Sequence, residues 1–335
     1  MKQNSAGEPV KHIVITGARG YIGNALAKRL ADAGHALRLV SRASDAPRMA
    51  AESAPNIAYV QADLRDERTW RDVMAGAETI VHLSSRTDLR AAEADATDDD
   101  RINIEPLRSL IRAATRSARR PNVVFASTVT IVGTEHGNPV DEKTPDRPCS
   151  VYDRHKLACE TLLREATAAG VLRACSLRLS NVYGYGRTST NANRGILNTM
   201  MQRAANGEVL TIYGDGLYVR DFTHLGDVVE AFCAAAASDH ICDGSHYVIA
   251  TGQGYALAEA FDLVAQEALL QTGRCIEICQ VPEPPDLHPI ERRNFVGNSS
   301  LFHALTGWQP RIDLKTGIRD YFVRAVASPA VAVGR

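Results

Sequence analysis

Long hydrophobic runs, a strong net charge and paired cysteines are missing from this 335-residue sequence. A membrane span needs about 20 apolar residues, whereas the apolar run 232–237 is stopped by Ser238 and Asp239. The net charge of -1 gives no electrostatic footprint for nucleic acid. Residues 1–9 are polar and lack the apolar region of a signal peptide. We therefore expect a cytoplasmic protein that has no nucleic-acid or membrane partner.

The cysteines and acidic residues do not form an obvious metal site. Seven cysteines are an odd number, and no C-x-x-C pair occurs among them, which is typical of reduced thiols. Cys275 and Cys279 alternate with apolar residues and lack the His or Cys partners that zinc requires. The acidic segment from Asp95 to Asp100 has no rigid spacing of its carboxylates, so we interpret it as a solvated loop. No metal ion is expected.

A strand, a glycine turn and a helix follow one another near the start of the chain. Residues 10–16 form a near-continuous apolar run, which is typical of a buried parallel strand. Gly17 permits a tight turn, Gly20 lets the backbone approach a pyrophosphate, and Gly23 allows the helix to pack closely on the strand. The helical pattern that follows ends at Gly34. This order predicts a dinucleotide site at the helix N-terminus, with a purely structural turn as the alternative.

The end of the second expected strand, 37–41, indicates which dinucleotide binds. In NAD sites an acidic residue at this place binds the ribose 2′-hydroxyl, whereas this chain has Ser41 and Arg42. A guanidinium suits a 2′-phosphate, and Arg19 in the glycine turn can reach the same group. Each arginine alone is equally compatible with a solvated surface position. Together they favour NADP(H) over NAD(H).

Strands and helices alternate through the first half of the chain. Further strands are expected at 57–61, 79–83 and 123–126, and helices at 69–74 and 103–118. Alternation of this kind predicts an α/β fold with a doubly wound, parallel Rossmann sheet, in which ligands collect at the carboxyl ends of the strands. The residues expected along this edge are Gly17, Arg42, Asp63 and Ser84.

Tyr152 and Lys156 lie four residues apart in a segment whose amphipathic pattern predicts a helix. This spacing puts the phenol and the ammonium on one face of the helix. A neighbouring cation favours the phenolate and brings proton transfer within reach of neutral pH. By itself the spacing is more typical of an exposed helix face. The interpretation as a proton-transfer pair therefore depends on the rest of the chain.

Motifs from the glycine turn to the C-terminal region supply that context. The run Ser127 to Gly133 follows a strand and precedes Tyr152 by a short loop, and Leu177 to Gly184 contains Arg-Leu-Ser-Asn-Val-Tyr-Gly. Gly214 to Phe222 and Thr306 to Pro310 continue the series in the same chain order. In these motifs the sequence resembles the extended short-chain dehydrogenase/reductase family, which includes nucleotide-sugar epimerases, dehydratases and ketoreductases.

The resemblance implies roles for individual residues. Thr128 takes the place of the catalytic hydroxyl, Tyr152 that of the proton donor, and Lys156 that of its electrostatic partner. Residues expected to bind the cofactor are Gly17, Arg19, Gly20, Tyr21, Ile22, Gly23, Arg42, Asp63, Leu64, Leu83, Ser84, Asn103, Tyr152 and Lys156. Residues expected to bind the substrate are Ser85, Thr128, Asn181, Arg220 on the nucleotide diphosphate, and Arg292, for which Arg293 is the alternative. Asn298 stands where the family usually has an acid, so recognition of the base is less defined.

Within the family, the resemblance favours one activity. Dehydratases carry Thr-Asp-Glu at the active-site turn, whereas Thr128, Val129 and Thr130 stand here, and dehydration is therefore excluded. Epimerases hold NAD tightly, which fits poorly with Arg19 and Arg42. Several runs, among them the helix of Tyr152, look most like the NDP-4-keto-6-deoxyhexose 4-ketoreductases. We therefore predict NADPH-dependent reduction of the C4 ketone of a nucleotide-linked 4-keto-6-deoxyhexose, with Tyr152 as the general acid.

Two other functions stay open. An NAD-dependent nucleotide-sugar 4-epimerase would use the same three catalytic residues, and a non-catalytic NADP-binding protein can have the same fold. The family also implies a homodimer and two domains. An NADP-binding domain is expected at 10–180 and about 223–251, with a smaller C-terminal nucleotide-sugar domain at 181–222 and 252–328. The base, the deoxygenation pattern and the product stereochemistry do not follow from the sequence.

Overall fold

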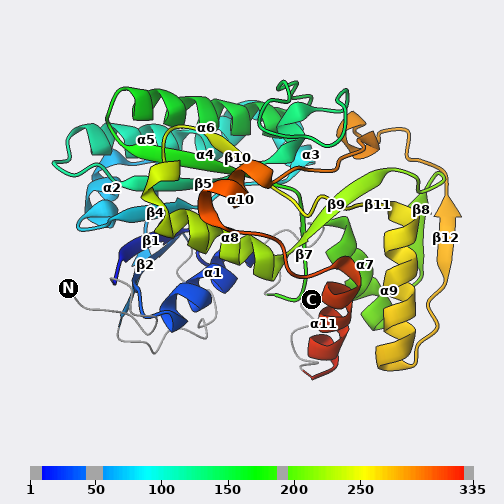
Figure 1. Cartoon of the computed structure of the whole chain (residues 1–335). Helices are drawn as coiled ribbons and strands as arrows, with labels where there is room; N and C mark the ends of the chain where they lie inside the picture. Colours follow the sequence, from blue (N-terminus) through cyan, green and yellow to red (C-terminus); the bar gives the residue numbers. More distant parts are fainter. Residues whose placement is uncertain (1–9, 43–55, 187–194, 328–335) are drawn as a thin grey trace.

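The computed structural model describes residues 10–42, 56–186 and 195–327. Within these residues, seven strands form one sheet in which all neighbours are parallel. The strands are β1 (His12–Thr16), β2 (Ala36–Ser41), β3 (Ile57–Gln61), β4 (Thr79–His82), β5 (Asn122–Thr128), β6 (Arg173–Leu179) and β10 (His246–Ile249). Their order is β3-β2-β1-β4-β5-β6-β10 (Figure 1). The order changes direction between β1 and β4, which is where sheets of this kind bind their ligands.

Two helix layers cover the faces of the sheet. One layer contains α1 (Tyr21–Asp32) and α8 (Leu225–Ala237), and the other contains α2 (Glu67–Met74), α5 (Glu105–Thr115) and α6 (Val151–Ala168) (Figure 1). Ile13 and Ile15 of β1 pack in the first apolar cluster, whereas Val14 between them packs in the second. Successive strand residues point to opposite faces, which is why a strand buried on both faces is apolar throughout. The doubly wound α/β fold is therefore confirmed.

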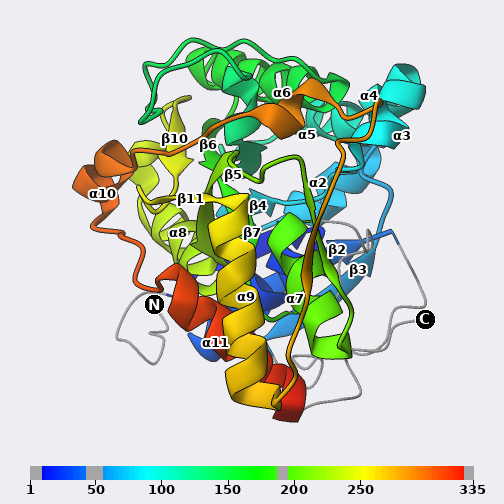
Figure 2. The ribbon, with the colours of Figure 1, turned by 90° about the vertical axis from the view of Figure 1, so that its right-hand side faces the viewer.

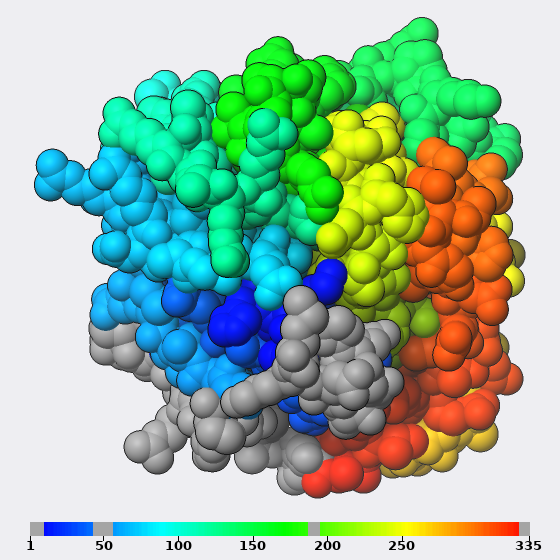
Figure 3. All heavy atoms as spheres, turned by 60° about the vertical axis from the view of Figure 1, so that its left-hand side comes forward, coloured from blue at the N-terminus to red at the C-terminus, as the bar shows by residue number. Residues whose placement is uncertain are grey.

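On one face of the molecule, N-terminal segments reach the surface between the two helix layers (Figure 3). Figure 3 shows the blue atoms of the N-terminal segments between the cyan atoms on the side of α2 and the yellow to olive atoms on the side of α8. Within the first strand, the three apolar residues Ile13, Val14 and Ile15 are at most 2% exposed.

A second unit lies beyond the carboxyl ends of the strands. It contains β7 (Asn181–Tyr183), β9 (Val219–His224) and β11 (Gly254–Ala256) in one small sheet, and β8 (Leu210–Tyr213) paired with β12 (Ile278–Val281) in another. Its helices are α7 (Ile196–Asn206), α9 (Leu257–Thr272) and α11 (Leu314–Ala327) (Figure 2). Its apolar core includes Leu197, Phe222, Phe261 and Phe322. The domain boundaries given above stay a prediction.

The remaining elements of the described residues are short. They are the helices α3 (Leu89–Ala94), α4 (Ala96–Asn103) and α10 (Ser300–Thr306), and the short 3₁₀ helices η1 (Val129–Val132), η2 (Asp239–Ile241) and η3 (Pro289–Arg292).

The prediction of a solvated loop from Asp95 to Asp100 is wrong. Asp95 caps α4 by accepting a hydrogen bond from the backbone N–H of Asp98, as capping aspartates do. Asp99 is fully buried, and its carboxylate accepts hydrogen bonds from Arg86 and contacts His155. Buried carboxylates require such partners, and these come from distant segments that the local pattern does not reveal.

Three expectations about the chain as a whole can be compared with the structure. No helix in the described part of the chain is long and apolar enough to cross a membrane. All seven cysteines are free thiols, of which Cys159, Cys175 and Cys242 are buried. Across residues 10–42, 56–186 and 195–327, no group of three or more His, Cys, Asp or Glu side chains is arranged to hold a metal ion.

Candidate active site

The carboxyl ends of four neighbouring strands carry most of the predicted site. Because β1, β4, β5 and β6 are consecutive neighbours, the residues that follow or end them form a row. Gly17 follows β1, Leu83 and Ser84 follow β4, Thr128 ends β5, and Asn181 lies just beyond β6. The structure therefore brings these residues to one edge of the sheet.

The glycine turn leaves no room for side chains where a dinucleotide would approach. Gly17 has a φ of +65°, and a Cβ atom there would lie 2.8 Å from the backbone N of Ser84. A Cβ atom at Gly23 would collide with the carbonyl oxygen of Gly17, and one at Gly20 would lie 3.1 Å from the same atom. Thr16 completes the turn, because its hydroxyl accepts a hydrogen bond of 3.2 Å from the Ser84 N–H. The turn thus fits the backbone approach that a pyrophosphate requires.

The start of α1 supplies the expected anion site. Gly20 is its N-cap and has no side chain to cap the helix, so the first backbone N–H groups can bind an anion. The phenol of Tyr21 donates a hydrogen bond of 2.6 Å to the carbonyl of Gly184, and burial raises the pKa of Tyr21. Ile22 packs against the core, and Arg19 is half-buried beside the turn. Tyr21 therefore connects the turn to the loop that follows β7.

The residues predicted to bind the cofactor at the end of β2 and in the loop after β3 differ in exposure. Arg42 is exposed, and its carbonyl accepts a hydrogen bond of 3.2 Å from Gln61. The guanidinium of Arg65 hydrogen-bonds the carboxylate of Asp63 and, with a small contribution from Arg42, lowers the pKa of Asp63 to about 2. Leu64 is buried at 6% exposure. Asp63 and Arg42 thus lie where an adenosine ribose would be expected, whereas Leu64 belongs to the core.

Asn103 fixes the loop that follows β4. Its side-chain oxygen accepts hydrogen bonds from the Ser85 hydroxyl at 3.0 Å and the Arg86 N–H at 2.7 Å. Its amide nitrogen donates to the Arg86 carbonyl at 3.0 Å and to Asp99 at 2.8 Å. Because all these bonds are made within the protein, Asn103 positions Ser85 rather than facing a ligand directly.

A buried group beneath this loop was not predicted from the sequence. Asp99 accepts a hydrogen bond from the Arg86 Nε at 2.9 Å, and its other oxygen lies 2.7 Å from the Nδ1 of His155. His155 immediately precedes Lys156, so this contact joins α4 to the helix that carries Tyr152 and Lys156.

The Tyr152 and Lys156 pair lies on the first turns of α6. The helix begins here because the hydroxyl of Ser150 accepts a hydrogen bond of 3.0 Å from the Asp153 N–H. Lys156 is 5% exposed, and its Nζ donates to the carbonyl of Ala126 at 2.7 Å. The same atom lies 5.7 Å from the ring centre of Tyr152. The ammonium is thus held between the end of β5 and the phenol.

Thr128 is connected to a buried carboxylate. Its hydroxyl lies 2.8 Å from the hydroxyl of Thr130, which donates in turn to Asp153. The other oxygen of Asp153 accepts a hydrogen bond of 2.6 Å from Ser150. Thr128 is 8% exposed and Asp153 is fully buried. No pattern in the sequence indicated Thr130 or Asp153 as members of this group.

Ser127 lies on the other side of the same turn. Its hydroxyl donates a hydrogen bond of 2.5 Å to Glu160, which binds the buried guanidinium of Arg178 at 2.6 Å. Burial alone would lower the pKa of Arg178, but the hydrogen bonds to Glu160 and Asp146 raise it. This ion-paired group anchors the end of β5 to β6 and α6.

The predicted substrate residues are divided between two places. Arg220 is 2% exposed, and its guanidinium donates to the carbonyls of Glu291 and Arg293. Arg293, which is 8% exposed, donates to the side chain of Asn181 at 3.2 Å. Arg292 instead pairs with Glu283 at 2.9 Å on the surface. The structure therefore brings Arg293, and not Arg292, next to Asn181.

The two buried arginines carry charge that the protein only partly neutralises. Burial lowers the pKa of Arg220 to about 9, with a further contribution from the like charge of Arg293. Burial also lowers the pKa of Arg293, against the opposing charges of Glu291 and Asp153. Within the described residues, the Nε of Arg293 is buried and has no hydrogen-bond partner. An anionic ligand would satisfy both the charge and this donor.

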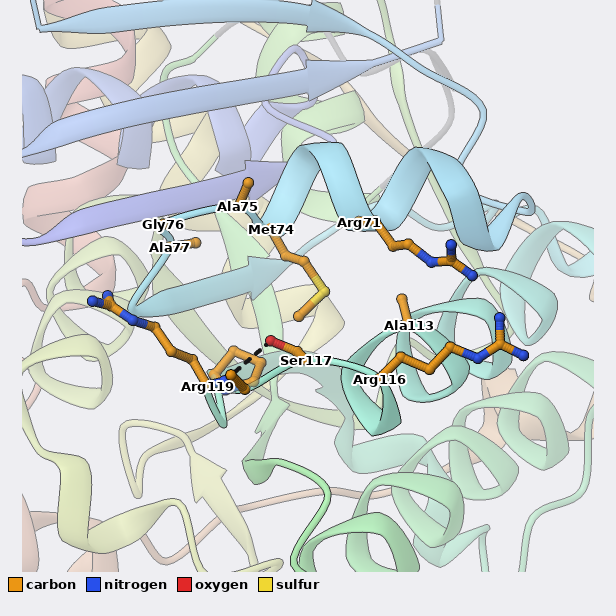
Figure 4. A pocket seen from close by; sticks show the side chains of 11 residues that line it. Arg71, Met74, Ala75, Gly76, Ala77, Ala113, Arg116, Ser117 and Arg119 are labelled. Carbon is orange, nitrogen blue, oxygen red and sulfur yellow. Dashed lines mark hydrogen bonds between the residues drawn. The ribbon is translucent and has the colours of Figure 1, made fainter.

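One hollow in the structure lies far from this site. It has a volume of about 260 Å³ and lies where α2 and α5 end, lined by Arg71, Met74, Arg116 and Arg119 (Figure 4). Ala77 and Pro121, which precede β4 and β5, also line it. It is therefore at the amino ends of the strands, opposite the edge that carries Tyr152 and Thr128.

A parallel Rossmann sheet with a glycine turn, a threonine hydroxyl and a Tyr/Lys pair at one edge defines the extended short-chain dehydrogenase/reductase class of enzymes. The model of the "NAD dependent epimerase/dehydratase family" matches residues 13–250 of the sequence. The chain therefore belongs to this family, whose members bind a nicotinamide dinucleotide and act on nucleotide sugars.

Three related proteins illustrate the similarity. The UDP-glucose 4-epimerase of Mycolicibacterium smegmatis is 27% identical over 91% of this chain and 95% of its own. The dTDP-glucose 4,6-dehydratase of Streptomyces griseus is also 27% identical, over 92% of both chains. The crystal structure of a UDP-glucose 4-epimerase from Thermotoga maritima with UDP-glucose has a TM-score of 0.83 and 23% identity, and covers 95% of this chain and 99% of that one. The last likeness shows the fold.

These relatives correct the predicted activity. The prediction of an NDP-4-keto-6-deoxyhexose 4-ketoreductase is wrong, because the related proteins are mainly nucleotide-sugar 4-epimerases rather than ketoreductases. The physical reason is that both reactions pass hydride and a proton at C4, and the resemblance implies the same three residues, Thr128, Tyr152 and Lys156, for either. Motifs around these residues therefore define the family and leave the direction and outcome of the reaction open.

Proposed function

We propose that this protein is a nucleotide-sugar 4-epimerase, which inverts the C4 hydroxyl of a hexose linked to a nucleoside diphosphate. The observation that carries the proposal is the row that contains Gly17 and Thr128 at one edge of the sheet, together with the Tyr152 and Lys156 pair on α6. This row combines a dinucleotide turn with the groups that alcohol oxidation and ketone reduction require. The epimerases among the related proteins favour inversion over net reduction.

Inversion at C4 needs a proton acceptor, a proton donor and an anchor for the rest of the substrate. Tyr152 takes the C4 hydroxyl proton and returns it after the ring has turned, and Thr128 hydrogen-bonds the same oxygen. Lys156, held by the carbonyl of Ala126, keeps a positive charge next to the phenol. When bound, the nicotinamide dinucleotide accepts and returns the hydride, so no cofactor is consumed.

The substrate diphosphate would bind at the two buried arginines. Arg293 has a buried Nε without a hydrogen-bond partner in the described chain, and it already contacts Asn181 from the edge of the row. Arg220 holds the backbone of this segment through its bonds to the carbonyls of Glu291 and Arg293. We assign direct diphosphate contact to Arg293 and a supporting position to Arg220, and Arg292 remains on the surface with Glu283.

For the cofactor, we propose NAD, as the description of the family model indicates. The end of β2 favours a second candidate, NADP, because Ser41 and the exposed Arg42 stand where NAD sites have an acid. Purified protein should be denatured and the released dinucleotide identified by mass spectrometry. Release of NAD supports the proposal, and release of NADP supports the prediction from Arg19 and Arg42.

The activity itself can be tested without added cofactor. Purified protein is incubated with UDP-glucose, UDP-N-acetylglucosamine or dTDP-linked hexoses, and the products are separated by chromatography. We expect conversion of at least one substrate to an equilibrium mixture with its C4 epimer. The Tyr152→Phe protein should retain its dinucleotide and lose at least about a hundredfold in rate. Absence of any epimer with the wild-type protein would refute the proposed function. The homodimer stays a prediction, which the elution volume of the same protein can test.

A further inference from the structure

The side-chain amide of Asn103 has one possible orientation in the loop that follows β4. One end of the amide accepts a hydrogen bond of 2.7 Å from the backbone N–H of Arg86, and the other end donates to the backbone carbonyl of Arg86 at 3.0 Å. A backbone N–H can only donate and a backbone carbonyl can only accept, so the two ends of the amide cannot be exchanged. The amide oxygen of Asn103 is therefore the atom that lies 3.0 Å from the hydroxyl of Ser85.

This orientation decides where the single hydrogen of the Ser85 hydroxyl points. The Oγ of Ser85 lies 3.0 Å from Oδ1 of Asn103 and 3.2 Å from the carbonyl oxygen of Arg86. Both of these oxygens are acceptors, so they take the hydrogen and cannot donate one in return. The lone pairs of the Ser85 hydroxyl are thus left for a ligand. To donate to a ligand instead, Ser85 would have to give up its bonds within the protein.

Ser85 lies between the dinucleotide turn and the helix of the Tyr/Lys pair. The strand before it, β4, is the neighbour of both β1 and β5. The preceding residue, Ser84, belongs to the turn, since its backbone N would lie 2.8 Å from a Cβ atom at Gly17. Ser85 is half-buried and is held from the opposite side, because the carbonyl of Asn103 accepts a hydrogen bond of 3.5 Å from Cys159 of α6. Its lone pairs are therefore at the place where a sugar would meet the dinucleotide.

We propose that Ser85 determines substrate specificity by accepting a hydrogen bond from a hydroxyl of the hexose other than the one at C4. The inference rests on the proposed function and defines its substrate class. A hydroxyl satisfies the lone pairs of Ser85, whereas a carboxylate or a keto oxygen at the same place would bring a second acceptor against them. The substrate is therefore a nucleotide-linked hexose that keeps its hydroxyl at this position, in preference to a uronic acid, a ketosugar or a deoxysugar modified there.

Analogues of the sugar test the direction of this hydrogen bond. The parent compound is the nucleotide hexose that the epimerase assay identifies, or UDP-glucose where it identifies none. In separate analogues, each hydroxyl except that at C4 is replaced by hydrogen or by fluorine, neither of which can donate. At one position, both replacements should lower the kcat/KM of the wild type by about three- to tenfold, as expected for a neutral hydrogen bond. A fluorine that restores the rate lost with hydrogen at that position would show that Ser85 donates, which overturns the proposal.

Two adjacent serines provide a matched pair of variants. In Ser85→Ala, the parent compound should lose about three- to tenfold in kcat/KM, and the analogue altered at the contact position should lose nothing further. In Ser84→Ala, the ratio of kcat/KM between parent and analogue should remain that of the wild type, whatever the overall rate. Each ratio compares two ligands on the same protein, so a change in stability does not alter it. A wild-type ratio that persists in Ser85→Ala would overturn the proposal.

The dinucleotide is a second source of hydroxyl and amide donors, and binding measurements separate it from the sugar. Titration of dinucleotide-free protein with NAD and with NADP should give the same dissociation constants for the wild type and Ser85→Ala. Weaker dinucleotide binding by the variant, with unchanged ratios for the sugars, would place the cofactor against Ser85 and overturn the proposal. A wild type that binds the sugars without epimerising them refutes the proposed function alone, because dissociation constants of the analogues then test Ser85. A wild type that binds none of them refutes both.

Discussion

Replacement of Gly17 by alanine provides a quantitative test of the dinucleotide turn. Alanine at a φ of +65° costs about 1–2 kcal/mol, because its Cβ crowds its own backbone in the left-handed region. The new Cβ would also lie 2.8 Å from the Ser84 N and 2.9 Å from the Leu83 carbonyl carbon, both of which belong to the backbone. Overpacking against atoms that cannot rotate away costs about 1–3 kcal/mol more. We therefore expect Gly17→Ala to lower the free energy of unfolding by about 2–5 kcal/mol.

Gly76 provides the matched control. Its φ is +74°, but nothing lies within 4 Å of the position that a Cβ atom would take. It lies in the turn between α2 and β4, beside the hollow of Figure 4 and away from the dinucleotide turn. Gly76→Ala should therefore lose only the conformational part, about 1–2 kcal/mol. The difference between the two variants isolates the collision with β4.

Urea denaturation of dinucleotide-free protein measures both free energies, and titration with the dinucleotide measures binding. Gly17→Ala should unfold at a lower urea concentration with an unchanged slope, and its dinucleotide affinity should fall, because relief of the collision moves β1 and β4 apart. Gly76→Ala should bind the dinucleotide as the wild type does. Equal stability losses in the two variants, or normal binding by Gly17→Ala, would refute the role assigned to the turn.

Three further changes test other parts of the site. Arg293→Met should raise KM for the nucleotide sugar by about ten- to a hundredfold, since a charged hydrogen bond contributes about 1.5–3 kcal/mol. Arg292→Met should change this KM little. Steady-state kinetics of the two variants compares the KM values. Burial, with a smaller contribution from Lys156, lowers the pKa of His82 from 6.5 to about 3. Between these two pH values the unfolded chain binds a proton that the folded chain does not. The free energy of unfolding should therefore fall as the pH decreases through this interval. Denaturation curves of His82→Asn should lack that part of the pH dependence. Asp99→Asn should lower the unfolding free energy by about 3 kcal/mol. This is the lower end for a broken buried pair, and we choose it because the side chain of Arg86 is 24% exposed. An unchanged urea midpoint would contradict this prediction.

The sequence predicted the sheet well because burial on both faces leaves a clear mark. Ile13, Val14 and Ile15 divide between the two apolar clusters, and this explains a run without alternation. The glycine turn was also visible, because Gly17 and Gly23 occupy places that no side chain can fill. Both features are local, and a single stretch of sequence contains them.

The features that the sequence missed depend on distant partners. Asp99 looks like a solvated carboxylate until His155, 56 residues further on, is placed 2.7 Å from it. Arg292 and Arg293 are neighbours in the chain, and only the path of the backbone decides that Arg293 faces Asn181. The activity was wrongly predicted for a related reason, since the roles that the resemblance implies for Thr128, Tyr152 and Lys156 are the same in oxidation and in reduction.

The place of β10 in the central sheet has a consequence for biosynthesis. Residues 246–249 form the last strand, which pairs with β6 through His246 and Ser176. Until the ribosome has released these residues, β6 is an open edge with unpaired backbone groups, and such edges associate with other chains. The nascent protein thus has to protect this edge while about seventy more residues are made, at roughly 5–20 residues per second. A shortened protein that stops before residue 246 would keep the edge permanently, so the first 180 residues cannot be treated as an independent cofactor-binding unit.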